Sequence, residues 1–169
     1  MKPKILFILH LPPPIHGAAM MGKYIQESEL VNSSFDCFCI NLATAGSLSD
    51  IGHISLKKLL KYFFLLKHIS HVVREIRPEL VYITPNAGGK AFFKDFIVVQ
   101  MLKSMGCKVI AHYHNKGVSV YQSKWVYNFF YKRFFSNLKV ILLAENLYKD
   151  IAKYVKREDV YICPNGIPN

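Results

Sequence analysis

Two histidines close the apolar segment 108–114, and they are the side chains of this sequence best suited to do chemistry. Successive side chains of a strand point to opposite faces, so His112 and His114 should share one face. A neutral imidazole there could orient a hydroxyl or a phosphate, or transfer a proton. We expect His114, at the strand end, to reach a ligand, whereas His112 fits equally well as a hydrogen-bonded core histidine. The paired spacing could also bind zinc, but no third ligand is evident from residue order, and we expect no metal.

A second candidate site lies where the strand-like segment 4–10 gives way to three prolines. Prolines cannot continue a central strand, and Gly17 then begins a helix whose first turn holds only small residues. Uncovered backbone N–H groups at a helix start attract phosphate or carboxylate, and His16 should line the same mouth. The alternative is an ordinary turn glycine beside a solvent-facing histidine. A dinucleotide site is not predicted, because Gly-x-Gly-x-x-Gly is absent and only Gly17 and Gly22 occur here.

Three further loops follow predicted strands and combine glycine with small polar or basic residues. At the carboxyl ends of parallel strands such loops commonly meet a ligand, but they also simply close turns. Both interpretations stay open for each loop. The candidate substrate-binding residues in two of them are Asn86, Gly88, Gly89, Asn115 and Lys116, and the third loop is 43–47.

These candidates need a scaffold that gathers strand ends, and the sequence alternates apolar strand-like segments with helical ones. The alternation predicts an α/β fold with a doubly wound, parallel, Rossmann-like sheet in a single domain over residues 1–169. We expect the strand order 3-2-1-4-5-6, with Gly17, the loop 86–89 and His114 at one edge. The predicted strands are 4–10, 35–41, 79–84, 108–114, 139–143 and 160–163, and the predicted helices begin at Gly17 and span 56–76, 91–105, 123–135 and 145–155.

Composition and charge limit the partners. Hydrophobic residues make up 51% of the 169 and charged residues 20%, which favours a packed fold over disorder. The net charge of +11 favours phosphates, nucleic acid or an acidic membrane surface. Four cysteines without a Cys-x-x-Cys pair fit reduced core residues of a cytoplasmic protein. We expect neither a signal peptide nor a spanning helix, because the apolar runs are too short.

Two predicted helical segments, 57–67 and 124–135, combine aromatic side chains with basic ones. Their apolar residues could pack on the sheet, which is the ordinary arrangement. Basic residues beside exposed rings also suit a helix lying on an anionic membrane. Nucleic acid is the competing partner, but no recognition motif supports it and we expect none. These segments therefore predict peripheral contact with the inner face of the cell membrane.

Three segments together resemble the amino-terminal half of a GT-B-fold glycosyltransferase, of the large retaining group called family 4 or group 1. They are Pro12-Pro-Pro-Ile-His-Gly17, His112-Tyr-His114 and the terminal Pro164-Asn-Gly-Ile167. By position, Gly17 matches the second glycine of the family's first loop, and His114 matches a strand-end histidine close to the transferred sugar. Asn165 and Gly166 match the string that leads into the second domain.

Two positions depart from this pattern. His16 stands where the first glycine of the loop is usual, which alters how the loop would approach a phosphate. Ala144 stands where a serine is common, before Glu145. Neither departure touches the strand-end histidine.

The resemblance implies an enzyme that moves a hexosyl group from a nucleotide-sugar to a saccharide or lipid-linked acceptor, in polysaccharide or lipopolysaccharide assembly. The nucleotide-sugar is a co-substrate, and no cofactor is expected. In such enzymes a second domain holds most of the nucleotide-sugar site, and nothing follows Asn169 here, so we expect the acceptor-binding half, inactive alone. The alternative is a non-catalytic Rossmann-like module that binds a phosphorylated ligand or an anionic membrane. A nucleic-acid binder using the +11 charge is a third hypothesis.

Overall fold

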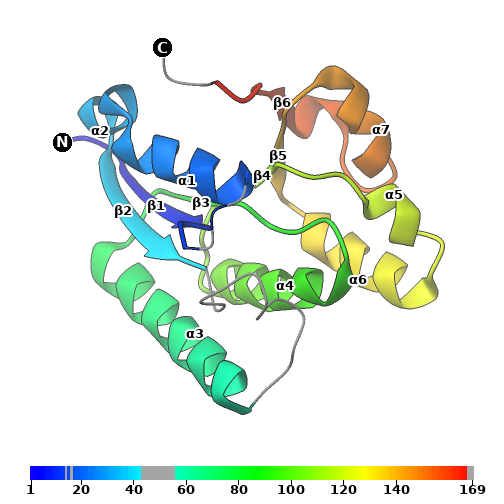
Figure 1. The fold of residues 1–169 in the computed structure, drawn as a ribbon, viewed down its shortest axis with the longest axis horizontal. Helices are drawn as coiled ribbons and strands as arrows, with labels where there is room; N and C mark the ends of the chain where they lie inside the picture. Colours follow the sequence, from blue (N-terminus) through cyan, green and yellow to red (C-terminus); the bar gives the residue numbers. More distant parts are fainter. Residues whose placement is uncertain (14, 16, 43–55, 167–169) are drawn as a thin grey trace. The chain divides into compact units, whose positions relative to one another are not determined.

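The computed structural model describes residues 1–13, 15, 17–42 and 56–166. It confirms the predicted α/β class, with six parallel strands and helices between them. The chain divides into two compact units, Met1–Tyr82 and Ile83–Asn169, and each is described by itself. The strands are β1 Lys4–Leu9, β2 Asp36–Asn41, β3 Leu80–Ile83, β4 Val109–Tyr113, β5 Lys139–Leu142 and β6 Val160–Ile162; the helices are α1 Gly17–Glu27, α2 Glu29–Ser34, α3 Leu56–Ile76, α4 Gly89–Ser104, α5 Val118–Tyr121, α6 Trp125–Phe135 and α7 Tyr148–Ile151 (Figure 1).

The predicted strand order was wrong. The sheet runs β2-β1-β3-β4-β5-β6, so β3 follows β1 instead of lying beyond β2. Both orders obey the right-handed crossover rule, which is why residue order alone did not separate them. In the observed order the switch in winding direction falls at β1, as in flavodoxin-like sheets.

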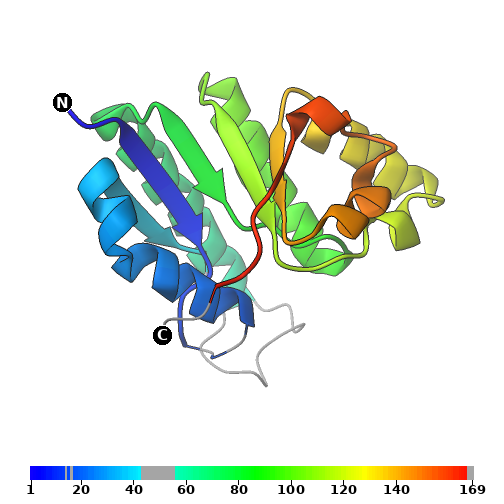
Figure 2. The ribbon, with the colours of Figure 1, turned by 90° about the horizontal axis from the view of Figure 1, so that it is seen from above.

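The first unit is built on β1 and β2, which are parallel from Lys4 opposite Asp36 to Leu9 opposite Asn41. Helices α1 and α3 lie on opposite sides of this pair (Figure 2), so β1 is buried from its second residue to its last. Gly22 brings α1 against the strand end, because a Cβ there would lie 2.3 Å from the His10 carbonyl oxygen.

The second unit is held together by aromatic rings between α4 and α6, which lie side by side (Figure 1). The rings of Phe92 and Tyr131 are 4.6 Å apart, and those of Phe96 and Phe130 are 4.8 Å apart. Tyr131, Phe134 and Phe135 are buried. Three of the seven aromatic residues of α6 are thus core residues, as in the ordinary alternative for this segment, whereas Trp125 and Phe129 are exposed.

The structure also contains short helices that the sequence did not predict. Helix α2 is capped by Ser28, whose Oγ accepts the Val31 N–H at 3.3 Å. Helix α5 has four residues. The predicted helix 145–155 is reduced to a 3-10 turn, Glu145–Leu147, followed by α7. Elements this short lack the hydrophobic repeat from which longer helices are recognised.

Candidate functional site

His114 lies directly after β4, at the carboxyl end of the strand, and is half-buried. Both of its ring nitrogens are buried, and neither closes a hydrogen bond of ordinary geometry with another described residue. Burial lowers the pKa of this imidazole, although the nearby Asn165 side chain favours the protonated form. At neutral pH His114 is therefore an uncharged ring with one donor and one acceptor nitrogen, and Asn165 is the described side chain placed to hydrogen-bond one of them.

His112 lies beside it on the same face of the strand, as predicted, with 4.2 Å between the ring centroids. It is buried, and burial, followed by the proximity of His114, lowers its pKa to about 3. A hydrogen bond to the Cys163 backbone opposes this shift without reversing it. His112 is therefore a neutral core histidine that underlies His114, in agreement with the plainer of its two interpretations.

The loops after β3 and β4 are tied to each other. The Asn115 Oδ1 atom accepts the Ala87 N–H at 3.1 Å, and the Tyr131 hydroxyl donates to the Ala87 carbonyl. Asn86 donates its backbone N–H and its side-chain amide to the Asp95 Oδ2 atom, both at 2.8 Å. The predicted residues Asn86 and Asn115 thus hold the two loops in place at the carboxyl edge of the strands.

The loop after Lys116 offers less to a phosphate than the sequence suggested. Asp150 accepts the N–H groups of Gly117, Val118 and Ser119 at 2.8 to 3.0 Å, and also the Ser119 hydroxyl. Burial alone would raise the pKa of Asp150, but these hydrogen bonds outweigh it and hold the pKa below its ordinary value. A carboxylate of the chain thus occupies the backbone N–H groups of Gly117, Val118 and Ser119, while the Lys116 side chain is exposed and accessible to an anion.

Positions 88 and 89 each require glycine, but for different structural reasons. A Cβ on Gly88 would lie 2.3 Å from the Tyr121 ring, and the backbone at this position is extended. Gly89 has φ +68° and open space where its Cβ would be. Gly88 therefore admits a ring of the chain itself, while Gly89 admits the left-handed turn that starts α4. Whether either also touches a substrate stays a prediction.

The remaining predicted residues lie elsewhere. His16 and the loop 43–47 are outside the described residues, and Gly17 begins α1 with nothing within 4 Å of its Cβ position. Gly17 belongs to the first unit and His114 to the second, so their sharing of one site stays a prediction. Asn165, the interdomain candidate, lies beside His114, and Gly166 is exposed.

Sequence reasoning missed Asp95 and Asp150, the two carboxylates that hold these loops. Both lie inside helices, and Asp150 is 33 residues from Gly117. No local pattern marks either one. A carboxylate on the buried side of a helix is the only signal that could have indicated Asp95, which is buried.

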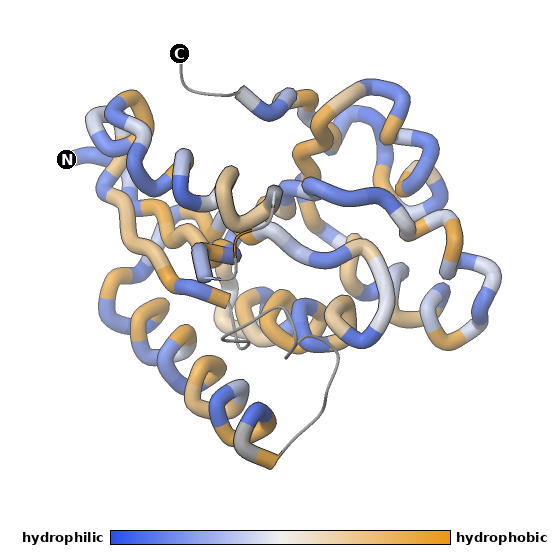
Figure 3. Tube along the Cα trace, in the orientation of Figure 1, coloured by the Kyte–Doolittle hydropathy of each residue, from blue (hydrophilic) through white to orange (hydrophobic). Residues whose placement is uncertain are grey.

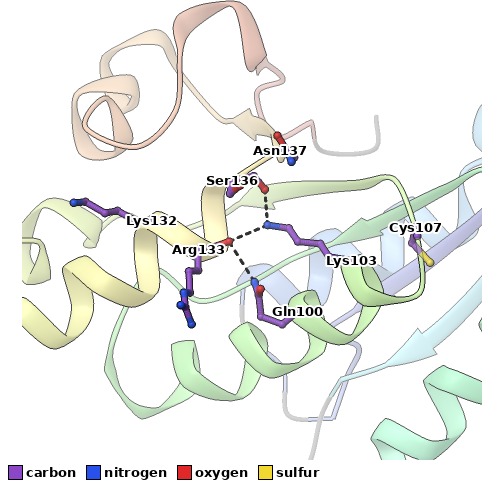
Figure 4. A pocket seen from close by; sticks show the side chains of 8 residues that line it. Gln100, Lys103, Cys107, Lys132, Arg133, Ser136 and Asn137 are labelled. Atoms are coloured by element: carbon purple, nitrogen blue, oxygen red, sulfur yellow. Dashed lines mark hydrogen bonds between the residues drawn. The ribbon is translucent and has the colours of Figure 1, made fainter.

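An open cavity lies at the other end of the strands, near the start of β4 and the end of α6, lined among others by Lys103, Lys132 and Arg133 (Figure 4). Lys103 donates to the carbonyls of Arg133, Phe134 and Ser136 at 2.6 to 3.0 Å and so closes the end of α6. Lys132 points away from it in Figure 4. These cations do not converge, and parallel sheets bind ligands at the opposite edge. The histidine edge is therefore the better candidate site.

Within the described residues, no three His, Cys, Asp or Glu side chains come close enough together to hold a metal ion. Comparison with protein-family models, with curated proteins and with solved structures finds no match to this chain. A proposal of function therefore rests on the geometry of the site and on the residues of its motifs.

Proposed function

We propose that this chain is the acceptor-binding half of a retaining glycosyltransferase, which moves a hexosyl group from a nucleotide-sugar to a saccharide or lipid-linked acceptor. The observation that carries the proposal is His114. Its neutral ring lies at the carboxyl end of β4 with both nitrogens buried, and the Asn165 side chain is the described group placed to hydrogen-bond it. A buried polar atom that stays unsatisfied is costly, and one Asn165 side chain serves at most one of the two ring nitrogens, so a ligand hydroxyl would complete the hydrogen bonding of the ring.

The reaction breaks the bond between the sugar's anomeric carbon and the donor phosphate, and the electron pair leaves with the nucleoside diphosphate. The acceptor hydroxyl oxygen bonds to that carbon, and its proton passes to the departing phosphate, a base that the reaction itself supplies. His114 would hold a sugar hydroxyl while this exchange takes place. Asn86 and Asn115 would keep the surrounding loops fixed, since Asn86 donates to Asp95 of α4 and Asn115 accepts the Ala87 N–H of the neighbouring loop.

The proposal includes a second domain that binds most of the nucleotide-sugar, and it needs no further cofactor. His16 and Gly17 would then approach the donor phosphates, with Lys116 as an exposed charge nearby. The second candidate is a binding module without catalysis. The position of Asp150 argues against a phosphate site at Lys116, because this carboxylate already accepts the backbone N–H groups of Gly117 and Val118 that a phosphate there would use. A phosphate-binding module would therefore have to rely on other groups.

The test is transfer of labelled sugar by the protein in which this chain is followed by its second domain. UDP-glucose and GDP-mannose serve as donors, and membrane lipid extract or oligosaccharides serve as acceptors. We expect transfer by the two-domain protein and none by residues 1–169 alone, because the chain lacks one wall of the cleft. We expect Lys116→Ala to weaken donor binding with little change in turnover, as for an exposed charge that salt screens. Donor or acceptor binding without any transfer would favour the binding module instead.

A further inference from the structure

The first half of α3 carries an apolar stripe on a side that the fold leaves exposed. Its residues follow the spacing i, i+3, i+4, i+7, i+8, so they lie on one face of the helix. The core-facing side of α3 is supplied separately by residues such as Ile69 and Val73, which are buried. The stripe consists of Leu56, Leu59, Leu60, Phe63 and Phe64, which are 74, 61, 52, 51 and 62% exposed. Hydrophobic residues recur along α3 in Figure 3, and an exposed apolar patch commonly marks an interaction surface.

Basic side chains border this stripe. Lys61 and Lys67 are exposed, and the Lys67 Nζ atom lies 4.9 Å from the centre of the Phe63 ring. From Leu56 to Arg74 the helix contains no acidic residue. Beyond Phe64 the same face continues as Lys67 and Arg74, so an apolar end passes into one that carries basic side chains, up to the pair that His71 forms with Glu75 at 3.5 Å.

We propose that α3 docks this protein on an anionic lipid bilayer. The stripe Leu56–Phe64 enters the head-group region, and Lys61, Lys67 and Arg74 contact lipid phosphates. This assignment does not depend on the proposed glycosyl transfer. No helix among the described residues has the length and hydropathy that crossing a membrane requires. The stripe occupies about three turns of helix, a length suited to lying in the interface.

Charge favours a bilayer over the other occupants of such a face. A second copy of this chain would bring the lysine borders of two α3 helices together, on molecules that each carry a net charge of +11. A nucleic acid would neutralise the lysines but leave the leucines and phenylalanines in water. An anionic bilayer supplies phosphates for the lysines and an apolar layer for the stripe at the same boundary.

The exposed rings of α6 form a smaller surface than the stripe of α3, made of Trp125 and Phe129. Trp125 is 81% exposed, but Tyr131 and Phe134 of the same helix are buried. The Arg133 guanidinium covers Phe129, with 4.3 Å from its central carbon to the ring centre. Trp125 provides a control on the second unit, because it is a large exposed ring beside Lys124 and lies outside the stripe of α3.

Co-sedimentation of the 169-residue chain with phosphatidylcholine vesicles, with and without phosphatidylglycerol, tests the proposal. We expect binding only to the anionic vesicles. Leu60→Ser with Phe63→Ser should lower the partition coefficient by about tenfold or more, because two inserted side chains are lost. The double variant Lys61→Gln with Lys67→Gln should lower the partition coefficient similarly. Salt of about 0.5 M should abolish the difference between this lysine variant and wild type, because it screens the charges. Trp125→Ser should stay within about twofold of wild type, because it lies outside the stripe.

Several outcomes would overturn the proposal. Equal pelleting with neutral and anionic vesicles would exclude the electrostatic contact, and an equal loss on Trp125→Ser would exclude α3 as the specific element. A dimer that Leu60→Ser with Phe63→Ser dissociates would assign the stripe to a second copy. Circular dichroism provides the folding control. If Leu60→Ser with Phe63→Ser unfolds the protein, the stripe packs within the chain and the proposal is wrong. If the protein stays folded, Lys61→Gln with Lys67→Gln measures the electrostatic part of vesicle binding independently.

Discussion

At the scale of single residues, the second unit buries two ionisable groups with shifted pKa values, Asp95 and His112. The two shifts change the stability of the fold in opposite directions as the pH falls. Burial raises the pKa of Asp95 to about 6, despite two hydrogen bonds from Asn86 that oppose the shift. Burial lowers the pKa of His112 to about 3. As the pH falls from 6 towards 4, folded Asp95 takes up a proton that the unfolded chain does not yet hold, which stabilises the fold. Folded His112 lacks a proton that the unfolded chain already holds, which destabilises it.

These two contributions oppose each other between about pH 4 and pH 6, where each amounts to at most about 1.4 kcal/mol per pH unit. Replacing Asp95 by Asn removes the contribution that stabilises the fold as the pH falls. We therefore expect the free energy of unfolding of Asp95→Asn to fall more steeply on acidification than that of wild type. Urea unfolding at a series of pH values measures both slopes. The exposed Asp36→Asn is the charge-matched control, and the prediction fails if Asp95→Asn and wild type have the same slope.

At the scale of elements, the start of α4 is packed under a ring from α5. Tyr121 stacks on Tyr127 at 4.6 Å and covers Gly88, where a Cβ would meet the ring. Gly88→Ala should lower the free energy of unfolding by about 1–3 kcal/mol, as expected for overpacking. In a Tyr121→Ala background most of that loss should disappear, because the backbone of Gly88 is extended and suits any residue.

Gly89 is the matched control for this pair, since its φ of +68° penalises any side chain whatever lies nearby. The cost of Gly89→Ala should therefore be the same with and without the Tyr121 ring. Thermal or urea unfolding of the single and double variants separates the two effects. A Gly88→Ala cost that persists unchanged without the ring would contradict the steric account.

Long elements were predictable because their hydrophobic pattern is local. The bounds of α3 match the prediction at both ends, and α1 begins at Gly17 as expected. Helix α4 begins two residues earlier than predicted, at Gly89, because its first turn contains glycine rather than a capping side chain. The short α2 and α5 carried no repeat to detect. Strand order depends on which neighbour each crossover reaches, and that information is not local.

At the scale of the whole molecule, the sequence predicted which strand ends form the candidate site, but it did not predict the side chains that hold the loops there. His114, Asn86 and Asn115 follow strands, so strand ends alone placed them at the carboxyl edge of β3 and β4. Asp95 and Asp150, which hold those loops, reach them from helices through contacts distant in sequence. The exposed stripe of α3 was indistinguishable from a core face until the fold showed which side packs inward.

The most direct test of the proposed function is the turnover of His114→Ala in the two-domain protein, measured as transfer of labelled sugar. Losing one positioned hydrogen-bonding group should lower turnover on the order of 10²-fold. The fold should be preserved, because a half-buried residue just beyond a strand end contributes little to the core. Circular dichroism and the unfolding midpoint check this. A well-folded His114→Ala enzyme with near-normal turnover would contradict the account, and His114 would then be a second buried core histidine beside His112.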